Sequence, residues 1–234
     1  MKINSKQIEH LYQFTRQHYV KWYDLQTELV DHLANAIEQQ WQENPKISFE
    51  DALQAEFKKF GIFGFMDVVE KRQIALGEKY NSLIWKHFIA FFKTPQIVGV
   101  FLFSFLVGEV FKNIYFDGIY SVLFLLGFVL TTTFFLITKH KTKKKKEKQK
   151  KIWLFENMIY SYGNATMFMY LPFQFINGIS HFHNLNSNTF LLYLMSFFTV
   201  SFYLAMYVVT VIIPSKAEAY LKETYPEYAL ENGI

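Results

Sequence analysis

Residues 189–213 read TFLLYLMSFFTVSFYLAMYVVTVII and decide the class of this protein, because they contain no charged side chain. A helix needs about 20 mostly apolar residues to cross the hydrocarbon core of a bilayer. Three more apolar stretches cover about 95–114, 119–138 and 153–178. A buried core of a soluble protein is the alternative, but four such stretches leave too little polar chain to cover them. We expect an all-α protein whose residues 95–213 form a domain of four transmembrane helices.

A strongly basic segment, KHKTKKKKEKQKK (139–151), separates the second and third stretches. Its nine lysines and one glutamate give +8, whereas the whole chain carries +4, so the basic character is local. The loops 115–118 and 179–188 contain no lysine or arginine. Because lysine-rich short loops stay on the cytoplasmic side, we expect a multi-pass membrane protein with both termini in the cytoplasm.

The same lysines are candidates for setting this topology and for binding anionic lipid headgroups. Two predicted spans hold the segment at both ends, so membrane lipids are expected partners and nucleic acid is not. The lysines are Lys139, Lys141, Lys143, Lys144, Lys145, Lys146, Lys148, Lys150 and Lys151.

Residues 1–80 have the pattern of a separate cytoplasmic domain of about four helices. In YDLQTELVDHLANAIEQQW (23–41), Leu25, Leu29, Leu33 and Ile37 recur every four residues, which is typical of one buried helix face, and Asp24 is the expected N-cap. A first helix is expected over about 4–20.

The next helix is expected to start at Ser48, with Asp51 in an approximate capping box, and to stop at Gly61. We expect its buried stripe to contain Phe49, Leu53, Phe57 and Phe60. A fourth helix should begin near Gly64. Residues 81–94 suit an amphipathic connector at the headgroups, Trp153 suits the interface belt at the start of the third span, and 214–234 suit a polar cytoplasmic tail. The N-terminus lacks the apolar core of a signal peptide.

The stretches ELVDHLANAIEQQ, SFEDALQAEFKKFG and FGFMDVV together resemble the HAAS or permease-prefix domain of bacterial membrane proteins. The likeness covers about residues 8–72 and rests on the acidic E…DH…A…E helix, the S-x-E-D-A helix start and the closing glycine turn. The usual Leu-Gly-x-Pro corner is Phe60-Gly61-Ile62-Phe63 here. The resemblance implies a membrane sensor or regulatory partner in a bacterial cytoplasmic membrane, often beside PadR-like regulators or ABC-type permeases. The four spans resemble no family.

Several polar side chains are candidates for function. Within the spans they are Glu109, Asn157, Ser161 and Asn164, because a polar or ionisable group in the bilayer is costly. Glu109 lies near the outer end of its span, three residues before Lys112, so an interfacial or paired structural acid is the alternative. Glu156 lies next to the lysine segment, where an acid costs little. In the N-terminal domain, Glu28, Asp31 and His32 are candidates for partner binding, with a surface ion pair between Glu28 and His32 as the alternative.

Nothing in the sequence predicts catalysis, a cofactor or a metal. The chain has no cysteine, and His181 and His183 of the outer loop lack the neighbouring acids that a zinc or copper site needs. No nucleotide-binding, GxSxG or HExxH motif is present. We therefore expect a non-catalytic sensing or regulatory protein that binds a protein partner through its N-terminal domain. The alternatives are a small transporter or permease subunit that acts as a homo-oligomer, and a membrane-embedded enzyme acting on lipid or peptide.

Overall fold

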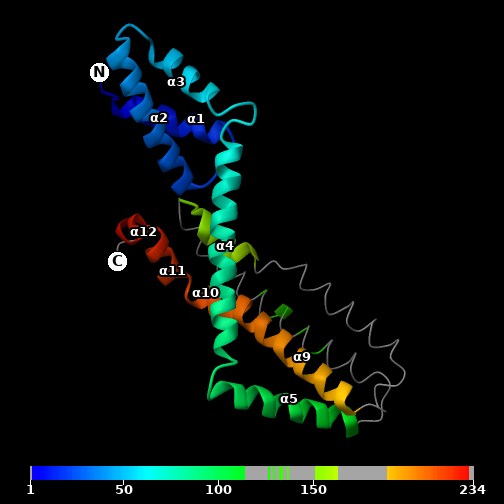
Figure 1. The fold of residues 1–234 in the computed structure, drawn as a ribbon. Coiled ribbons are helices and arrows are strands. Elements are labelled where there is room, and N and C mark those ends of the chain that lie inside the picture. The colour runs from blue at the N-terminus through cyan, green and yellow to red at the C-terminus, as the bar shows by residue number, and fades with distance from the viewer. Residues whose placement is uncertain are drawn as a thin grey trace. The chain divides into compact units, whose positions relative to one another are not determined.

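The computed structural model describes residues 2–113, 126, 129, 132, 133, 136, 151–162 and 189–231. Within these residues the secondary structure is helical, with no strand, which confirms the all-α class (Figure 1). The chain divides into two compact units. The first consists of Met1–Lys79 and Lys148–Asn157, and the second of Tyr80–Glu147 and Met158–Ile234.

The first unit is a small helical bundle with its own core. It contains α1 (Ser5–Gln17), α2 (Tyr23–Glu43), α3 (Phe49–Lys58) and the first part of α4 (Met66–Ala90). α2 packs against both α1 and α3 (Figure 1). The predicted stripe of α2, Leu25, Leu29, Leu33 and Ile37, is buried, and Trp41 one turn later is buried as well. Each buried Leu or Ile contributes roughly 1.5–3 kcal/mol relative to exposure, so this stripe is a main source of the unit's stability.

Local capping fixes two of the helix starts. Asn4 and Gln7 form a reciprocal capping box at the start of α1. Ser48 caps α3 as predicted, since its Oγ accepts a hydrogen bond of 3.1 Å from the amide of Asp51. The prediction of an Asp24 cap on α2 was wrong. Trp22 occupies that position without a side-chain hydrogen bond, and Asp24 is engaged elsewhere.

α3 is shorter than the sequence pattern predicts. It ends at Lys58, and Gly61 lies in the following turn with a φ of +77°. The fully buried face is also rotated, because it consists of Ala52, Leu53 and Glu56. Three of the four predicted stripe residues, namely Phe49, Phe57 and Phe60, are half-buried. Only Leu53 belongs to both sets.

A segment from the second half of the chain completes the first unit. The amide of Tyr23 donates to the carbonyl of Ile152 at 2.8 Å, and the amide of Leu154 donates to Asp24 Oδ1 at 3.0 Å. Trp153, which we expected at a membrane interface, is buried here and packs edge-on against Tyr23 with ring centroids 5.4 Å apart. The start of the predicted third span is therefore part of this unit's core.

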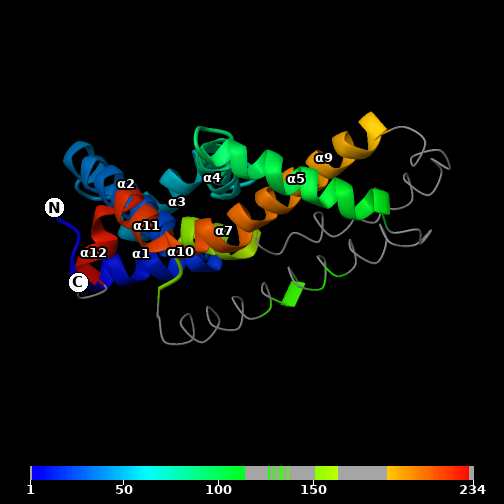
Figure 2. The ribbon, with the colours of Figure 1, turned by 90° about the horizontal axis from the view of Figure 1, so that it is seen from below.

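The second unit contains the rest of α4, α5 (Gln96–Asn113), most of α7 (Leu154–Tyr162), and a long C-terminal helical run. That run comprises α9 (Thr189–Tyr207), the π-helix η2 (Val208–Ile212), α10 (Ile213–Ser215), α11 (Ala217–Thr224) and α12 (Pro226–Glu231). α5 and α9 lie side by side in both views (Figures 1 and 2).

One helix among the described residues, Thr189–Ser215, is long and apolar enough to cross a membrane by its 27 residues and its composition. The described apolar part of α5, Gln96–Val110, is shorter. Most of the predicted second span and residues 163–178 of the third lie outside the described residues. The described residues thus contain one candidate membrane helix, whereas the whole sequence predicts four spans.

Candidate functional site

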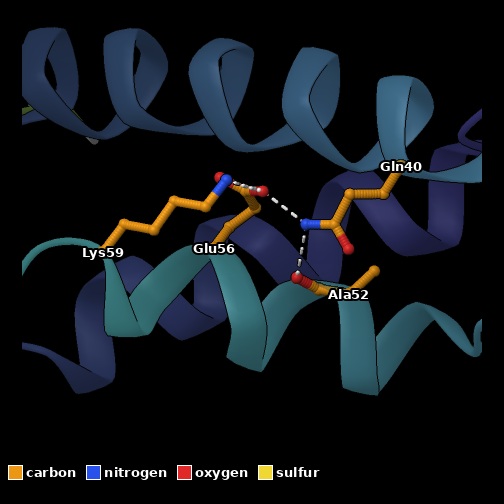
Figure 3. Close-up of polar contacts among 4 residues, drawn as sticks. All are labelled: Gln40, Ala52, Glu56 and Lys59. Atoms are coloured by element: carbon orange, nitrogen blue, oxygen red, sulfur yellow. Dashed lines mark hydrogen bonds and ion pairs between the residues drawn. The ribbon is translucent and has the colours of Figure 1, made fainter. Parts of the chain in front are cut away.

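A buried carboxylate joins two helices of the first unit. Glu56 on α3 is almost fully buried, and its Oε1 accepts hydrogen bonds from Gln40 Nε2 on α2 and from Lys59 Nζ, the latter at 2.6 Å (Figure 3). Gln40 Nε2 also approaches the carbonyl oxygen of Ala52 at 3.5 Å. An unpaired buried charge is costly, so these donors are what make the position tolerable.

The electrostatics of Glu56 reflect a competition between burial and its partners. Burial, the largest single effect, raises the pKa of the carboxyl, but the hydrogen bonds from Lys59 and Gln40 and the charges of Lys59 and His32 together hold this pKa below its usual value. Since its Oε1 already receives two donors, we interpret Glu56 as a structural link between α2 and α3. The sequence signal that could have found it is the opposite charge of Lys59 three positions later.

The predicted partner-binding residues share the outer surface of α2. Glu28, Asp31 and His32 are all exposed. The ion pair considered for Glu28 and His32 does not form among the described residues. Instead the His32 ring lies edge-on to Phe60, with centroids 5.9 Å apart. The exposed face of α2 thus carries two carboxylates and an imidazole, and its opposite face packs in the core of the unit.

The end of the lysine segment is attached to this unit. Lys151 places its Nζ 3.8 Å from the centroid of the Tyr23 ring, a cation–π contact. The other lysines of the segment, 139–150, lie outside the described residues. Among the polar candidates that follow, Glu156 is buried, Asn157 is half-buried and Ser161 is exposed.

Asn164, His181 and His183 lie outside the described residues. Among the residues that are described, no group of three or more His, Asp or Glu side chains could hold a metal ion.

Glu109 contacts the other apolar helix of the second unit. The Tyr193 hydroxyl of α9 donates a hydrogen bond to Glu109 Oε1 of α5. Lys112, the partner considered from sequence spacing, is exposed. No sequence pattern indicates Tyr193, because its pairing depends on how α5 and α9 pack rather than on any spacing within α5.

Small residues let α5 and α9 approach closely. The buried residues of α5 are Val100, Ser104 and Gly108, and those of α9 are Leu192, Ser196 and Val200. A Cβ at Gly108 would overlap the Tyr193 ring and lie 3.4 Å from Ser196 Oγ. Ser104 and Gly108 therefore lie where α5 contacts α9, as small residues commonly do where two helices pack closely.

A histidine contact joins the end of α4 to α11. His87 Nε2 and the Tyr220 hydroxyl are 2.6 Å apart. Burial, followed by the charges of Lys216 and Lys86, lowers the pKa of His87. Burial, with the charge of Glu223, raises the pKa of Tyr220. Both shifts favour the neutral forms, so the contact is a neutral hydrogen bond at neutral pH.

Comparison with known proteins adds no identification, since no family model, curated protein or solved structure matches this chain. The resemblance of residues 8–72 to the HAAS domain stays a prediction from sequence.

Proposed function

We propose that this chain is a four-span protein of the bacterial cytoplasmic membrane, and that its N-terminal unit binds a protein partner in a sensing or regulatory role. Both termini and the 139–151 segment are cytoplasmic in this proposal. The observation that carries it is the contrast between two parts of one chain. The first unit buries its apolar stripe under a charged surface, whereas α5 leaves large apolar side chains uncovered.

The exposed residues of α5 favour a lipid environment. Among the described residues it exposes Val98, Phe101, Leu102, Phe103, Phe105, Leu106 and Val110. A contiguous apolar surface of this kind is costly in water and natural in a bilayer. Together with the candidate membrane helix Thr189–Ser215, these side chains support insertion of the second unit in a membrane.

The outer surface of α2 supports partner binding. A surface that presents Glu28, Asp31 and His32 on a well-packed helix needs little reorganisation on binding, which favours affinity. Acidic groups of this kind select a basic partner and set the rate of encounter more than the final affinity. The HAAS-like pattern, which includes these residues, points the same way.

Co-purification of the full-length protein from membranes tests the role of α2. The double charge reversal Glu28→Lys/Asp31→Lys should release a partner that the wild type retains. The matched control is Glu9→Lys/Glu70→Lys, which reverses two exposed acids on α1 and α4. Retention of every co-purifying protein by the α2 variant would contradict this surface as the binding site.

A transporter or permease subunit is the second candidate, because Glu109 and Tyr193 place an acid and a hydroxyl together between two apolar helices. Four spans seldom enclose a pathway alone, so this function requires a homo-oligomer. Glu109→Gln keeps the shape of the side chain and removes its charge. It should abolish uptake in proteoliposomes if Glu109 carries a proton or ion, and an unchanged uptake rate would exclude that role.

A further inference from the structure

The first unit exposes a group of apolar side chains at one end. Ile62 and Phe63 form the turn between α3 and α4 and are 98 % and 70 % exposed. Met66, at the start of α4, and Tyr19, after the end of α1, are also exposed, at 45 % and 74 %. We call these four residues the apolar tip. Single exposed apolar residues are ordinary, but four at one end of a small unit call for an explanation.

A glycine lies on each side of Ile62 and Phe63 in the turn between α3 and α4. Gly61 and Gly64 both have positive φ, at +77° and +55°, which glycine adopts without strain. The Gly64 amide donates to the Gly61 carbonyl at 3.3 Å, and a Cβ at Gly64 would approach the Phe57 ring to 2.9 Å. In this turn the side chains of Ile62 and Phe63 lie on the surface of the unit.

An aromatic cluster brings the end of α1 to this turn. The centroid of the His18 ring lies 4.2 Å from that of Phe57 and 5.9 Å from that of Phe65. The ring of Phe14 also contacts the rings of Phe57 and Phe65. Tyr19 follows His18 directly and has a positive φ of 68°. The end of α1 and the turn before α4 accordingly lie side by side (Figure 1).

The two short segments that form the apolar tip carry charged side chains of one sign only. The two segments that form it, 16–21 and 58–66, contain Arg16, Lys21, Lys58 and Lys59 and no acid. Arg16, Lys21 and Lys58 are exposed, while Lys59 is bound to Glu56. The nearest acid along the chain is Asp67, in the first turn of α4.

We propose that the apolar tip docks on an anionic membrane surface. Exposed aromatic and aliphatic side chains flanked by cations are typical of segments that lie at the lipid headgroups. The unit is also tied by its own chain to the candidate membrane helix, so it meets the bilayer at a high effective concentration. The proposal rests on the membrane location proposed above, but not on a protein partner.

This docking constrains α4. The helix runs for 25 residues from Met66 to Ala90, which is about 37 Å at 1.5 Å per residue. The apolar tip lies at the start of α4, and the proposed first span follows the end of α4. Docking therefore requires α4 to lie along the bilayer rather than to stand upright on it. Ile74, eight positions after Met66, is also exposed and lies within about 80° of Met66 around the helix, so it faces the same surface.

The chain contains no cysteine, so single labels can be placed without background. Full-length Ile62→Cys, labelled with an environment-sensitive dye, is reconstituted in vesicles of neutral phosphatidylcholine with or without phosphatidylglycerol. We expect a blue-shifted emission that depends on phosphatidylglycerol and is quenched by nitroxide-bearing lipids. A label at Gln39→Cys, an exposed position of α2, should stay in water.

Charge variants test the anionic surface itself. Each cation near an anionic bilayer contributes about a factor of five, so Arg16→Gln/Lys21→Gln/Lys58→Gln should lower the ratio of docked to undocked protein about 100-fold. The control Lys2→Gln/Lys6→Gln/Lys46→Gln removes three other exposed lysines of the same unit and should leave the ratio unchanged.

Three results would overturn the proposal: emission typical of water in both vesicles, a shift that neutral vesicles produce equally, or a shift in detergent that grows with protein concentration. The last would assign the apolar tip to a second copy of the chain. Extraction of the protein from membranes by alkaline carbonate would instead contradict the membrane location, so the two failures are distinguishable.

Discussion

Replacing Lys59 by methionine should destabilise the packing of α3 on α2 and reverse its response to pH. Lys59 is the only cation that an ion pair joins to Glu56 among the described residues, and Glu56 is buried while 68 % of the Lys59 side chain is exposed. Breaking a fully buried pair costs about 3–5 kcal/mol, and an exposed pair is worth about 0–1 kcal/mol. For this half-exposed pair we expect a loss of about 1.4 kcal/mol of local stability, which is a tenfold increase in the equilibrium constant for local opening.

The pH dependence follows from which influence on Glu56 dominates. In the wild type the folded pKa of Glu56 lies below its ordinary value of 4.5, so its stabilisation is present above about pH 4.5 and is lost as the pH falls through the folded pKa. Without Lys59, burial should raise the folded pKa above 4.5. The variant should then gain stability as the pH falls from 7 toward 4.5, and its difference from the wild type should vanish in acid.

Hydrogen exchange of the α2 and α3 amides in the full-length protein measures this local opening. The matched control is Lys58→Met, which removes the neighbouring exposed lysine. We expect exchange of α3 to be about tenfold faster in Lys59→Met than in Lys58→Met at pH 7, and equal in the two variants below about pH 4. Equal exchange at pH 7, or a difference independent of pH, would refute the assignment of Lys59 as the charge that makes buried Glu56 tolerable.

Three further outcomes are expected. Gly108→Ala should lower the melting temperature of the purified protein, because the added Cβ would overlap Tyr193. Gly99→Ala on the same helix, where a Cβ would meet nothing within 4 Å, should leave the melting temperature unchanged or raise it. Equal effects of the two substitutions would contradict close packing at Gly108. Tyr220→Phe should speed hydrogen exchange in α11 by about fivefold, since a neutral hydrogen bond contributes about 1 kcal/mol. In the wild type, the stabilisation of the folded state by His87 should be present above the ordinary pKa of 6.5 and lost as the pH falls through the lowered folded pKa. A His87→Phe variant that kept this pH dependence of stability would exclude His87 as its source. Neutralising five lysines of 139–151 should scramble the topology mapped by single-cysteine accessibility; an unchanged map would show that the lysines do not set it.

Local patterns in the sequence predicted the local features of the fold. The four-residue spacing of Leu25, Leu29, Leu33 and Ile37 identified the buried face of α2, and Ser48 identified the start of α3. Both depend only on interactions within one or two turns of helix.

Features that depend on distant segments were not predicted. Asp24 is a residue type that often caps helices, but here it accepts a hydrogen bond from the amide of Leu154, which is 130 positions later. Trp153 is a residue type that is common at membrane interfaces. It nevertheless lies in the core of the first unit, because its neighbours form hydrogen bonds to the start of α2. The pairing of Glu109 with Tyr193 spans 84 positions. Periodicity reports which face of a helix is buried and carries no information about which helix covers it.

The packing of α5 on α9 also has a consequence for synthesis of the protein. Gly108 and Ser196 are 88 positions apart, so at about 5–20 residues per second a ribosome needs about 4–18 s to make the second after the first. During that interval α5 has been made while its eventual neighbour does not yet exist. The narrow surface of Ser104 and Gly108 stays uncovered for that time, and another small-residue helix could occupy it. Correct assembly of this chain therefore requires the surface of Ser104 and Gly108 to stay available until α9 has been made.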